Sequence, residues 1–109
     1  MSNESGINAG KEDIPLTRMD VDQLLRQAGS PEKLDLRGRN LKGIDLTYFN
    51  LAGVLLSETN LSGANLSEAD LTGADLSRAI LSGAILSGII LNRANLSQAI
   101  FADLQFYGA

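Results

Sequence analysis

Acidic and hydroxyl side chains recur through this chain, and they are the residue types with which catalysis or metal binding could begin. The aspartates Asp35, Asp45, Asp70 and Asp75 stand at positions that differ by multiples of five. Paired carboxylates can transfer protons, and a serine can act as a nucleophile when a base and an orienting group lie beside it. The chain has no histidine and no cysteine. It therefore lacks the commonest general base, the commonest metal ligand and any thiolate.

The aspartates are explained more simply as turn residues. Asp and Asn side chains can hydrogen-bond the backbone two residues further on, and glycine, which often follows in this sequence, tolerates positive φ. Successive aspartates are expected on adjacent faces of a coil, so they would not oppose one another across a cleft. The serines have no base beside them. We therefore expect no enzyme activity, no metal site and no cofactor.

The elements that position these residues are indicated by leucine, which returns every fifth residue from Leu36 to Leu96, with Phe101 and Phe106 in the same register. A period of five is neither the 3.6 of a helix nor the 2.0 of a strand. It requires a chain that extends briefly, turns, and points one large apolar residue inward in each unit. The residue two places before each leucine is mostly small or apolar, so it should face inward too. Stacked units can bury leucines that one unit cannot, so the repeat predicts a solenoid.

The position two places after each leucine suggests how many units make one coil. Between residues 43 and 83, glycine alternates there with a larger residue. With an even number of units per coil, glycines would stack on glycines and larger residues on larger residues. The alternation therefore favours a four-sided coil over a triangular one.

Residues 16–30 predict a capping helix ahead of the repeat. Thr17 with Asp20 forms one candidate capping pair, and Asp20 with Gln23 forms another. Gly29 stands where a helix-ending glycine belongs. The apolar stripe of this helix comprises Val21, Leu24, Leu25 and Ala28. Residues 1–15 are polar and are expected to form a disordered N-terminal tail.

Four units carry a recognisable motif: ANLSE (64–68), ADLTG (69–73), ADLSR (74–78) and ANLSQ (94–98). They resemble the pentapeptide-repeat family, whose pattern is A(D/N)LXX. The resemblance implies an all-β solenoid, a right-handed quadrilateral β-helix of twenty residues per coil. Residues 34–109 would form just under four coils. Family members commonly begin with a short helix that caps the first coil, and residues 17–28 fit that part.

Four isoleucines replace the Asp or Asn of the motif and should point outward: Ile80, Ile85, Ile90 and Ile100. In a twenty-residue coil, Ile80 and Ile100 stack on one face, while Ile85 and Ile90 lie on the next two faces. Contiguous exposed apolar surface often marks a binding site. The alternative is structural, because β-branched residues also stack well in ladders.

Two further features stand at the ends of the repeat. Phe101, Phe106 and Tyr107 lie at its C-terminal end, where we expect a plug or a contact with another subunit. Arg39 takes an inward position in the first coil. We expect its guanidinium to reach a carboxylate of the capping helix, Asp20 or Asp22.

These features predict a non-catalytic protein-binding or scaffold module that contacts a protein partner or a second copy of itself. The contact would use the outward isoleucines and the C-terminal end. The resemblance also offers an alternative, because some members of the family are DNA mimics that bind or protect DNA gyrase. A third possibility, ice or mineral binding by serine ladders, is weaker, because serine lacks the methyl group of threonine.

The composition limits the partners and the compartment. The net charge is −4, and neither half of the chain is basic enough for a nucleic-acid patch, so we expect no direct nucleic-acid binding. No apolar run reaches the length of a membrane span. The first fifteen residues contain no apolar core of a signal peptide. We expect a soluble cytoplasmic protein without membrane contact.

Overall fold

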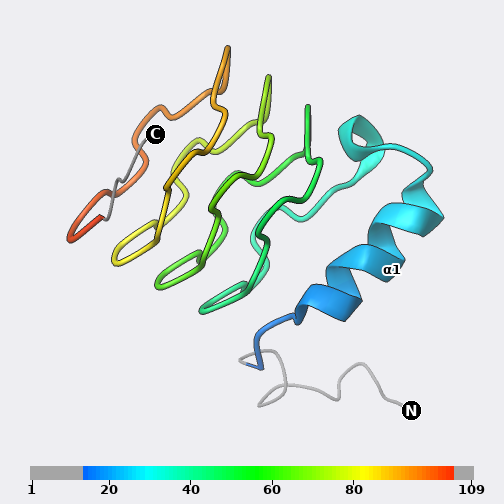
Figure 1. The fold of residues 1–109 in the computed structure, drawn as a ribbon, viewed down its shortest axis with the longest axis horizontal. Helices are drawn as coiled ribbons and strands as arrows, with labels where there is room; N and C mark the ends of the chain where they lie inside the picture. The colour runs from blue at the N-terminus through cyan, green and yellow to red at the C-terminus, as the bar shows by residue number, and fades with distance from the viewer. Residues whose placement is uncertain (1–13, 105–109) are drawn as a thin grey trace.

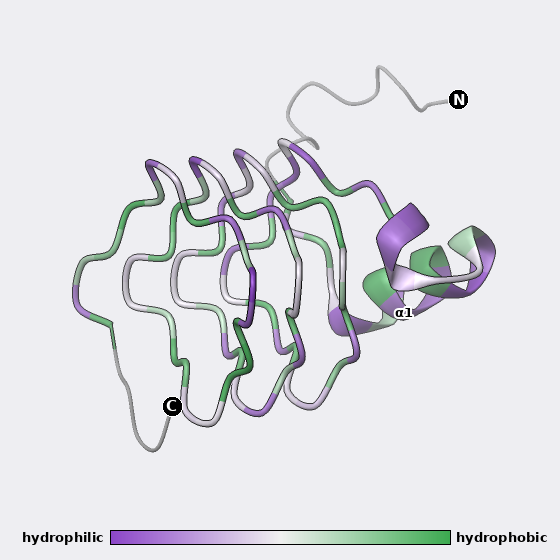
Figure 2. Ribbon diagram, turned by 90° about the horizontal axis from the view of Figure 1, so that it is seen from above, coloured by the Kyte–Doolittle hydropathy of each residue, from purple (hydrophilic) through white to green (hydrophobic). Residues whose placement is uncertain are grey.

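The structure, a computed structural model, describes residues 14–104 as a capping helix followed by a stack of coils (Figure 1). The helix α1 (Arg18–Ala28) leads through the short 3-10 helix η2 (Pro31–Lys33) into the coils. Single β-bridges join the coils, and the described residues contain no longer strands. Helix α1 lies at one end of the stack, opposite the C-terminal coil (Figure 2).

Every bridge is parallel and joins a residue to the one twenty places later, as in Asp35 with Leu55, Asn60 with Ile80, and Ile80 with Ile100. One coil therefore uses four of the five-residue units. The fold is a right-handed β-helix solenoid. Because each side of a coil stacks on the same side of the next, residues twenty apart form columns along the solenoid.

Each five-residue unit satisfies its backbone donors in a fixed way, as the unit 74–78 shows. The N–H of Asp75 donates to the preceding coil at 3.0 Å, and those of Leu76 and Arg78 donate to the following coil at 2.8 Å each. The N–H of Ala74 closes the preceding turn at 3.0 Å. The N–H of Ser77 donates to the carboxylate of Asp75 at 3.0 Å. All five N–H groups are therefore used, as buried or half-buried backbone requires.

The turns explain the alternation of glycine and larger residues. The third residue of each turn is left-handed, with φ near +69° at Gly63 and +61° at Glu58. Glycine adopts this conformation without strain, whereas other residues do so at a cost. In one column glycines stack on glycines, Gly43, Gly63 and Gly83, whereas Gly88 stacks on Glu68. This agrees with an even number of units per coil.

The core is the predicted leucine column. The leucines from Leu36 to Leu86 are at most 2% exposed, and the small inward residues from Ala64 to Ala84 are fully buried. Thr59 is the one buried polar residue of the described core, and its hydroxyl donates to the carbonyl of Leu56 at 2.8 Å. The inward column is therefore confirmed, and its polar exception is satisfied within its own turn.

Helix α1 begins and ends as predicted. The Thr17 hydroxyl accepts the N–H of Asp20 at 3.2 Å, and the Asp20 carboxylate accepts the N–H of Thr17 at 2.8 Å. This is the first of the two candidate capping pairs. Gly29 ends the helix in the left-handed conformation, with φ +92°. Val21 is fully buried against the first coil, and the rest of the apolar stripe is partly buried there.

The prediction for Arg39 is wrong. Its side chain is exposed, and it binds neither acid of the helix, because Asp20 caps Thr17 and Asp22 pairs with Arg26 at 2.9 Å. The helix covers the end of the coil with apolar side chains. A guanidinium buried there without a carboxylate would lose its hydration, so Arg39 remains in water.

Candidate protein-interaction surface

The outward column that precedes each leucine is the first candidate for chemistry. Nine of its described residues are Asp or Asn, and each accepts the N–H two residues further on at 3.0–3.2 Å. They are Asp35, Asn40, Asp45, Asn50, Asn60, Asn65, Asp70, Asp75 and Asn95. Some turns add a hydroxyl donor, as in Ser77 to Asp75 at 2.7 Å. These side chains close turns, as the sequence predicted.

The aspartates of this column are held in the ionised form. The side-chain hydrogen bonds of Arg37 lower the pKa of Asp35 to about 2. The backbone N–H and hydroxyl of Thr47 lower the pKa of Asp45. The hydroxyls of Thr72 and Ser77, with their N–H groups, lower the pKa values of Asp70 and Asp75. A general acid needs the opposite shift at neutral pH, so this column is built for turns.

The described residues contain no group of acids that could hold a metal ion. One open groove of about 570 Å³ runs along the column of Ser57, Ser77 and Ser97. Arg78 fills part of it, donating to Gln98 at 2.8 Å and lying 3.4 Å from the carboxylate of Glu58. Arg37, which also lines the groove, pairs with Asp35 of its own turn at 2.8 Å, so both arginines of this groove already have partners.

The predicted isoleucines stand on the outward column, as their bridges show. Ile80 and Ile85 are half-buried, whereas Ile90 is 41% and Ile100 is 51% exposed. Ile80 and Ile100 share one side of the solenoid, and Ile85 and Ile90 follow on the next two sides. The structure thus places Ile80, Ile85 and Ile90 around one coil and Ile100 on the next, as a belt rather than a single flat patch.

A fifth aliphatic residue of this column escaped the sequence analysis. Leu55 lies between Asp35 and Asp75, bridged to both, and is half-buried. The signal was available, because Leu55 directly precedes the periodic Leu56, where the motif has Asp or Asn. It was missed because two adjacent leucines look like an ordinary part of the leucine repeat.

Each aliphatic residue of the outward column leaves a turn donor without its usual acceptor. Within residues 14–104, the N–H groups two places after these residues have no hydrogen-bond acceptor: Ser57, Ser82, Ser87, Asn92 and Ala102. The isoleucine belt therefore combines apolar side chains with unused backbone donors.

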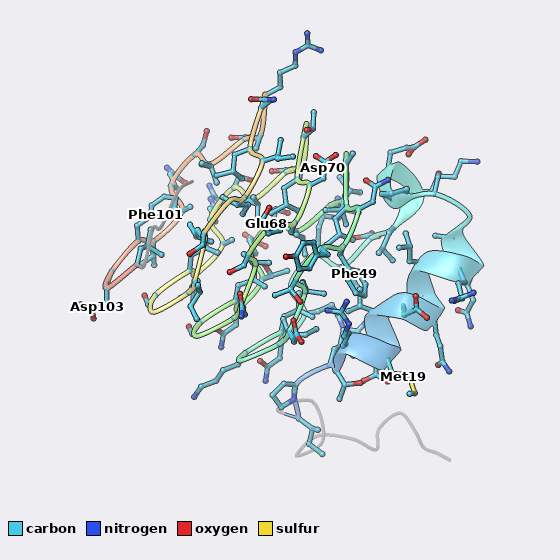
Figure 3. All side chains as sticks on the ribbon, in the orientation of Figure 1. Met19, Phe49, Glu68, Asp70, Phe101 and Asp103 are labelled. Atoms are coloured by element: carbon cyan, nitrogen blue, oxygen red, sulfur yellow. The ribbon has the colours of Figure 1, made fainter. Side chains whose placement is uncertain are left out.

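The C-terminal end offers a second part of the candidate surface. Phe101 is 44% exposed and, with Asp103, lies at the end of the coils farthest from α1 (Figure 3). Phe106 and Tyr107, the other predicted residues of this end, lie outside the described residues.

No helix of the described part is long and apolar enough to cross a membrane.

Comparison with known proteins identifies the repeat. The family profile described as "Pentapeptide repeats (8 copies)" matches residues 40–78, 50–88 and 79–109. The chain belongs to the pentapeptide-repeat family. The members of this family are repeat proteins that are generally not enzymes. No curated protein matches the chain by sequence.

Several solved pentapeptide-repeat structures are similar to this one. A protein of the cyanobacterium Cyanothece 51142 is 30% identical over 67% of this chain and 60% of its own, with a TM-score of 0.36. HetL of Nostoc sp. strain PCC 7120, described as involved in heterocyst differentiation regulation, is 36% identical over 65% of this chain and 38% of its own, with a TM-score of 0.32. A protein of the Arabidopsis thaliana thylakoid lumen is 34% identical over 68% and 59%, with a TM-score of 0.29. Because the TM-scores are low, the assignment rests on the family profile.

Proposed function

We propose that this pentapeptide-repeat solenoid is a non-catalytic protein-binding module. Its contact surface would be the outward isoleucines Ile80, Ile85, Ile90 and Ile100, together with the C-terminal end around Phe101. The partner is another protein or a second copy of the chain. The four-sided coil, which the resemblance implies, would keep the isoleucines at fixed positions around a rigid scaffold.

One observation carries the proposal. At nine outward positions, an Asp or Asn closes the turn with a hydrogen bond, and at the isoleucine positions this bond is absent. The turn chemistry favours Asp and Asn, so isoleucine serves something other than the turn. Exposed apolar residues that interrupt a polar column fit a surface that loses water on binding.

The rigidity of the scaffold supports the same proposal. Successive coils are joined on all sides by backbone hydrogen bonds of 2.7–3.1 Å, and the leucine column is closed to water from Leu36 to Leu86. A surface held in this way loses little conformational entropy when a partner binds.

Affinity capture from a native extract tests the proposal. The wild-type chain is compared with a variant carrying Ile85→Asn and Ile90→Asn, in which both turns regain an acceptor. We expect at least one protein to be retained by the wild type and lost by the variant. Light scattering across a concentration series measures the solution mass and shows whether the chain binds a second copy of itself. Identical captured proteins for both chains, with a monomer at all concentrations, would contradict the proposal.

DNA mimicry remains the alternative function. It requires acidic groups at phosphate-like density along the rod. The outward column here alternates acids with amides and aliphatic residues, which does not favour it. A gyrase supercoiling assay decides the matter, since a mimic would inhibit or protect the enzyme at stoichiometric concentration.

A further inference from the structure

Two corners of the described coils have an isoleucine on both sides, and the one between Ile80 and Ile85 is the more open, because the Glu68 carboxylate lies over Gly88 at the other. The two isoleucines flank a turn whose outer residues are Ser82 and Gly83, and the hydrogen bond that closes this turn measures 3.0 Å. A side chain at Gly83 would meet only the backbone of Gly63, at 3.8 Å. The backbone of this corner is therefore accessible between two apolar side chains.

The neighbouring coil shows what normally occupies this corner. Asn60 stacks directly on Ile80 through a parallel bridge, and its side-chain oxygen accepts the N–H of Ser62 at 3.0 Å. In the next coil, Ser82 takes the place of Ser62. Among the described residues, neither the N–H nor the hydroxyl of Ser82 has an acceptor. The N–H of Ser62 is therefore bonded to a side chain of its own turn, whereas the equivalent N–H of Ser82 is not.

The charges around the corner select the type of oxygen. The carboxylate of Glu68 lies directly over Gly88, at the next corner of the same coil. Asp103 takes the turn position equivalent to Gly83 one coil later, and the whole chain carries a charge of −4. A carboxylate at Ser82 would be repelled by Asp103 on the adjacent coil, and the cation on the preceding corner, Arg78, already lies 3.4 Å from the carboxylate of Glu58. An uncharged amide oxygen, which Asn60 supplies in the neighbouring turn, fits without that repulsion.

We propose that Ser82 receives an amide oxygen from an uncharged, extended segment of a protein partner, whose apolar side chains rest on Ile80 and Ile85. The partner segment would supply the acceptor for the N–H of Ser82. In the neighbouring coil, the side chain of Asn60 supplies the acceptor for the N–H of Ser62. This inference rests on the proposed function and specifies the partner. Main-chain donors give such a contact its orientation, and flanking apolar side chains give it specificity.

The test uses a phage library of random dodecapeptides, selected on the full wild-type chain. Binding of the selected peptide is measured by isothermal titration and by the amide resonance of Ser82 in heteronuclear NMR. In Ile80→Asn, the new side-chain oxygen accepts the N–H of Ser82, as the oxygen of Asn60 accepts the N–H of Ser62. Ser82→Pro removes the N–H together with the hydroxyl and should keep the turn, because proline is favoured at the second position of such a turn and this N–H is not used in the ladder.

Two control variants keep the donor. Ser82→Ala retains the N–H, and Ile80→Leu retains the apolar surface, as Leu55 does elsewhere in the outward column. We expect the peptide to shift the Ser82 amide to lower field and to bind Ile80→Asn and Ser82→Pro about tenfold more weakly. Ile80→Leu should bind within about twofold of the wild type. Replacing each Asn of the peptide by Ala then separates a side-chain oxygen from a main-chain carbonyl.

The inference is overturned if the Ser82 amide does not respond, if Ile80→Asn and Ser82→Pro both bind like the wild type, or if no peptide distinguishes the wild type from Ile80→Asn. Should Ser82→Pro fail to fold, Ile80→Asn and the amide shift still decide the outcome. A partner that depends on Ile85 and Ile90 but leaves Ser82 unaffected would preserve the proposed function and refute only this inference.

Discussion

The guanidinium of Arg18 lies over the ring of Phe49, with its central carbon 4.4 Å from the ring centroid. The same guanidinium donates to the carbonyl of Asp45 and to that of Thr47, each at 3.1 Å, and lies 3.2 Å from the Asp45 carboxylate. Arg18 is the first residue of helix α1. It therefore fixes the start of the helix to the first coil through both stacking and hydrogen bonds.

Replacing Arg18 should loosen the helix while the coils persist. Arg18→Ala is expected to cost about 1 kcal/mol of stability, since the pair is partly exposed and screened by solvent. Arg18→Lys retains the charge but loses the planar stacking and the forked hydrogen bonds, so it should recover less than half of the loss. Hydrogen exchange of the helix amides measures the effect. Unchanged exchange in Arg18→Ala would show that the apolar stripe alone docks the helix.

Two turn glycines separate backbone strain from steric contact. Gly63 and Gly53 both have left-handed φ, +69° and +81°. A side chain at Gly63 meets nothing within 4 Å, whereas one at Gly53 would lie 2.9 Å from the Cβ of Glu32. Gly63→Ala should therefore cost about 1 kcal/mol from strain alone. Gly53→Ala should cost about 2–3 kcal/mol, because it also displaces η2. Equal losses in urea unfolding would mean that η2 does not rest on this turn.

The leucine column carries the stability of the coils. Leu66 is fully buried, and Leu66→Ala is expected to cost about 2–5 kcal/mol in chemical unfolding. Leu96, near the end of the described coils, is only partly buried, so Leu96→Ala should cost about 1–2 kcal/mol. A loss at Leu66 below about 1 kcal/mol would contradict the inward assignment of this column.

The turn aspartates make stability depend on pH. The pKa of Asp35 is lowered to about 2 from an ordinary value of 3.8, and the pKa values of Asp70 and Asp75 are lowered as well. A folded-state pKa below the unfolded value stabilises the fold above about pH 4, and this contribution is lost as the pH falls toward 2. Urea unfolding at a series of pH values should show this decline.

Asparagine is the matched control for the pH effect. Asp70→Asn and Asp75→Asn keep the turn acceptor, as Asn65 does, but remove the titrating group. The double variant should lose less stability on acidification than the wild type. If both proteins respond equally to acid, or if Asp75 titrates by NMR at its ordinary value, the turn hydrogen bonds do not hold these carboxylates ionised.

The repeat made most of this fold predictable from the sequence. The inward leucines, the small inward residues and the Asp or Asn turns recur every five residues. Many units of the sequence therefore predict the same local geometry. The capping pair of Thr17 and Asp20 was one of two candidates, because both pairs have the required spacing. The outward direction of Ile80 and Ile85 followed from the same register.

The contacts between α1 and the first coil were not predictable in this way. The partners of Arg18 depend on how the helix crosses the coil, and no periodic pattern fixes that angle. The same lack of a pattern led to the wrong partner for Arg39. Leu55 was missed for the opposite reason, since its residue type matched the repeat too well. Sequence periodicity therefore specifies the columns of the solenoid but not the contacts at its ends.

We propose that the outward isoleucines are surface residues whose role lies outside folding. Chemical unfolding of the variant carrying Ile85→Asn and Ile90→Asn tests it most directly. We expect a free energy of unfolding within about 1 kcal/mol of the wild type, because each Asn regains a turn hydrogen bond. A loss of more than about 3 kcal/mol would show that these isoleucines belong to the core and that the outward assignment is wrong.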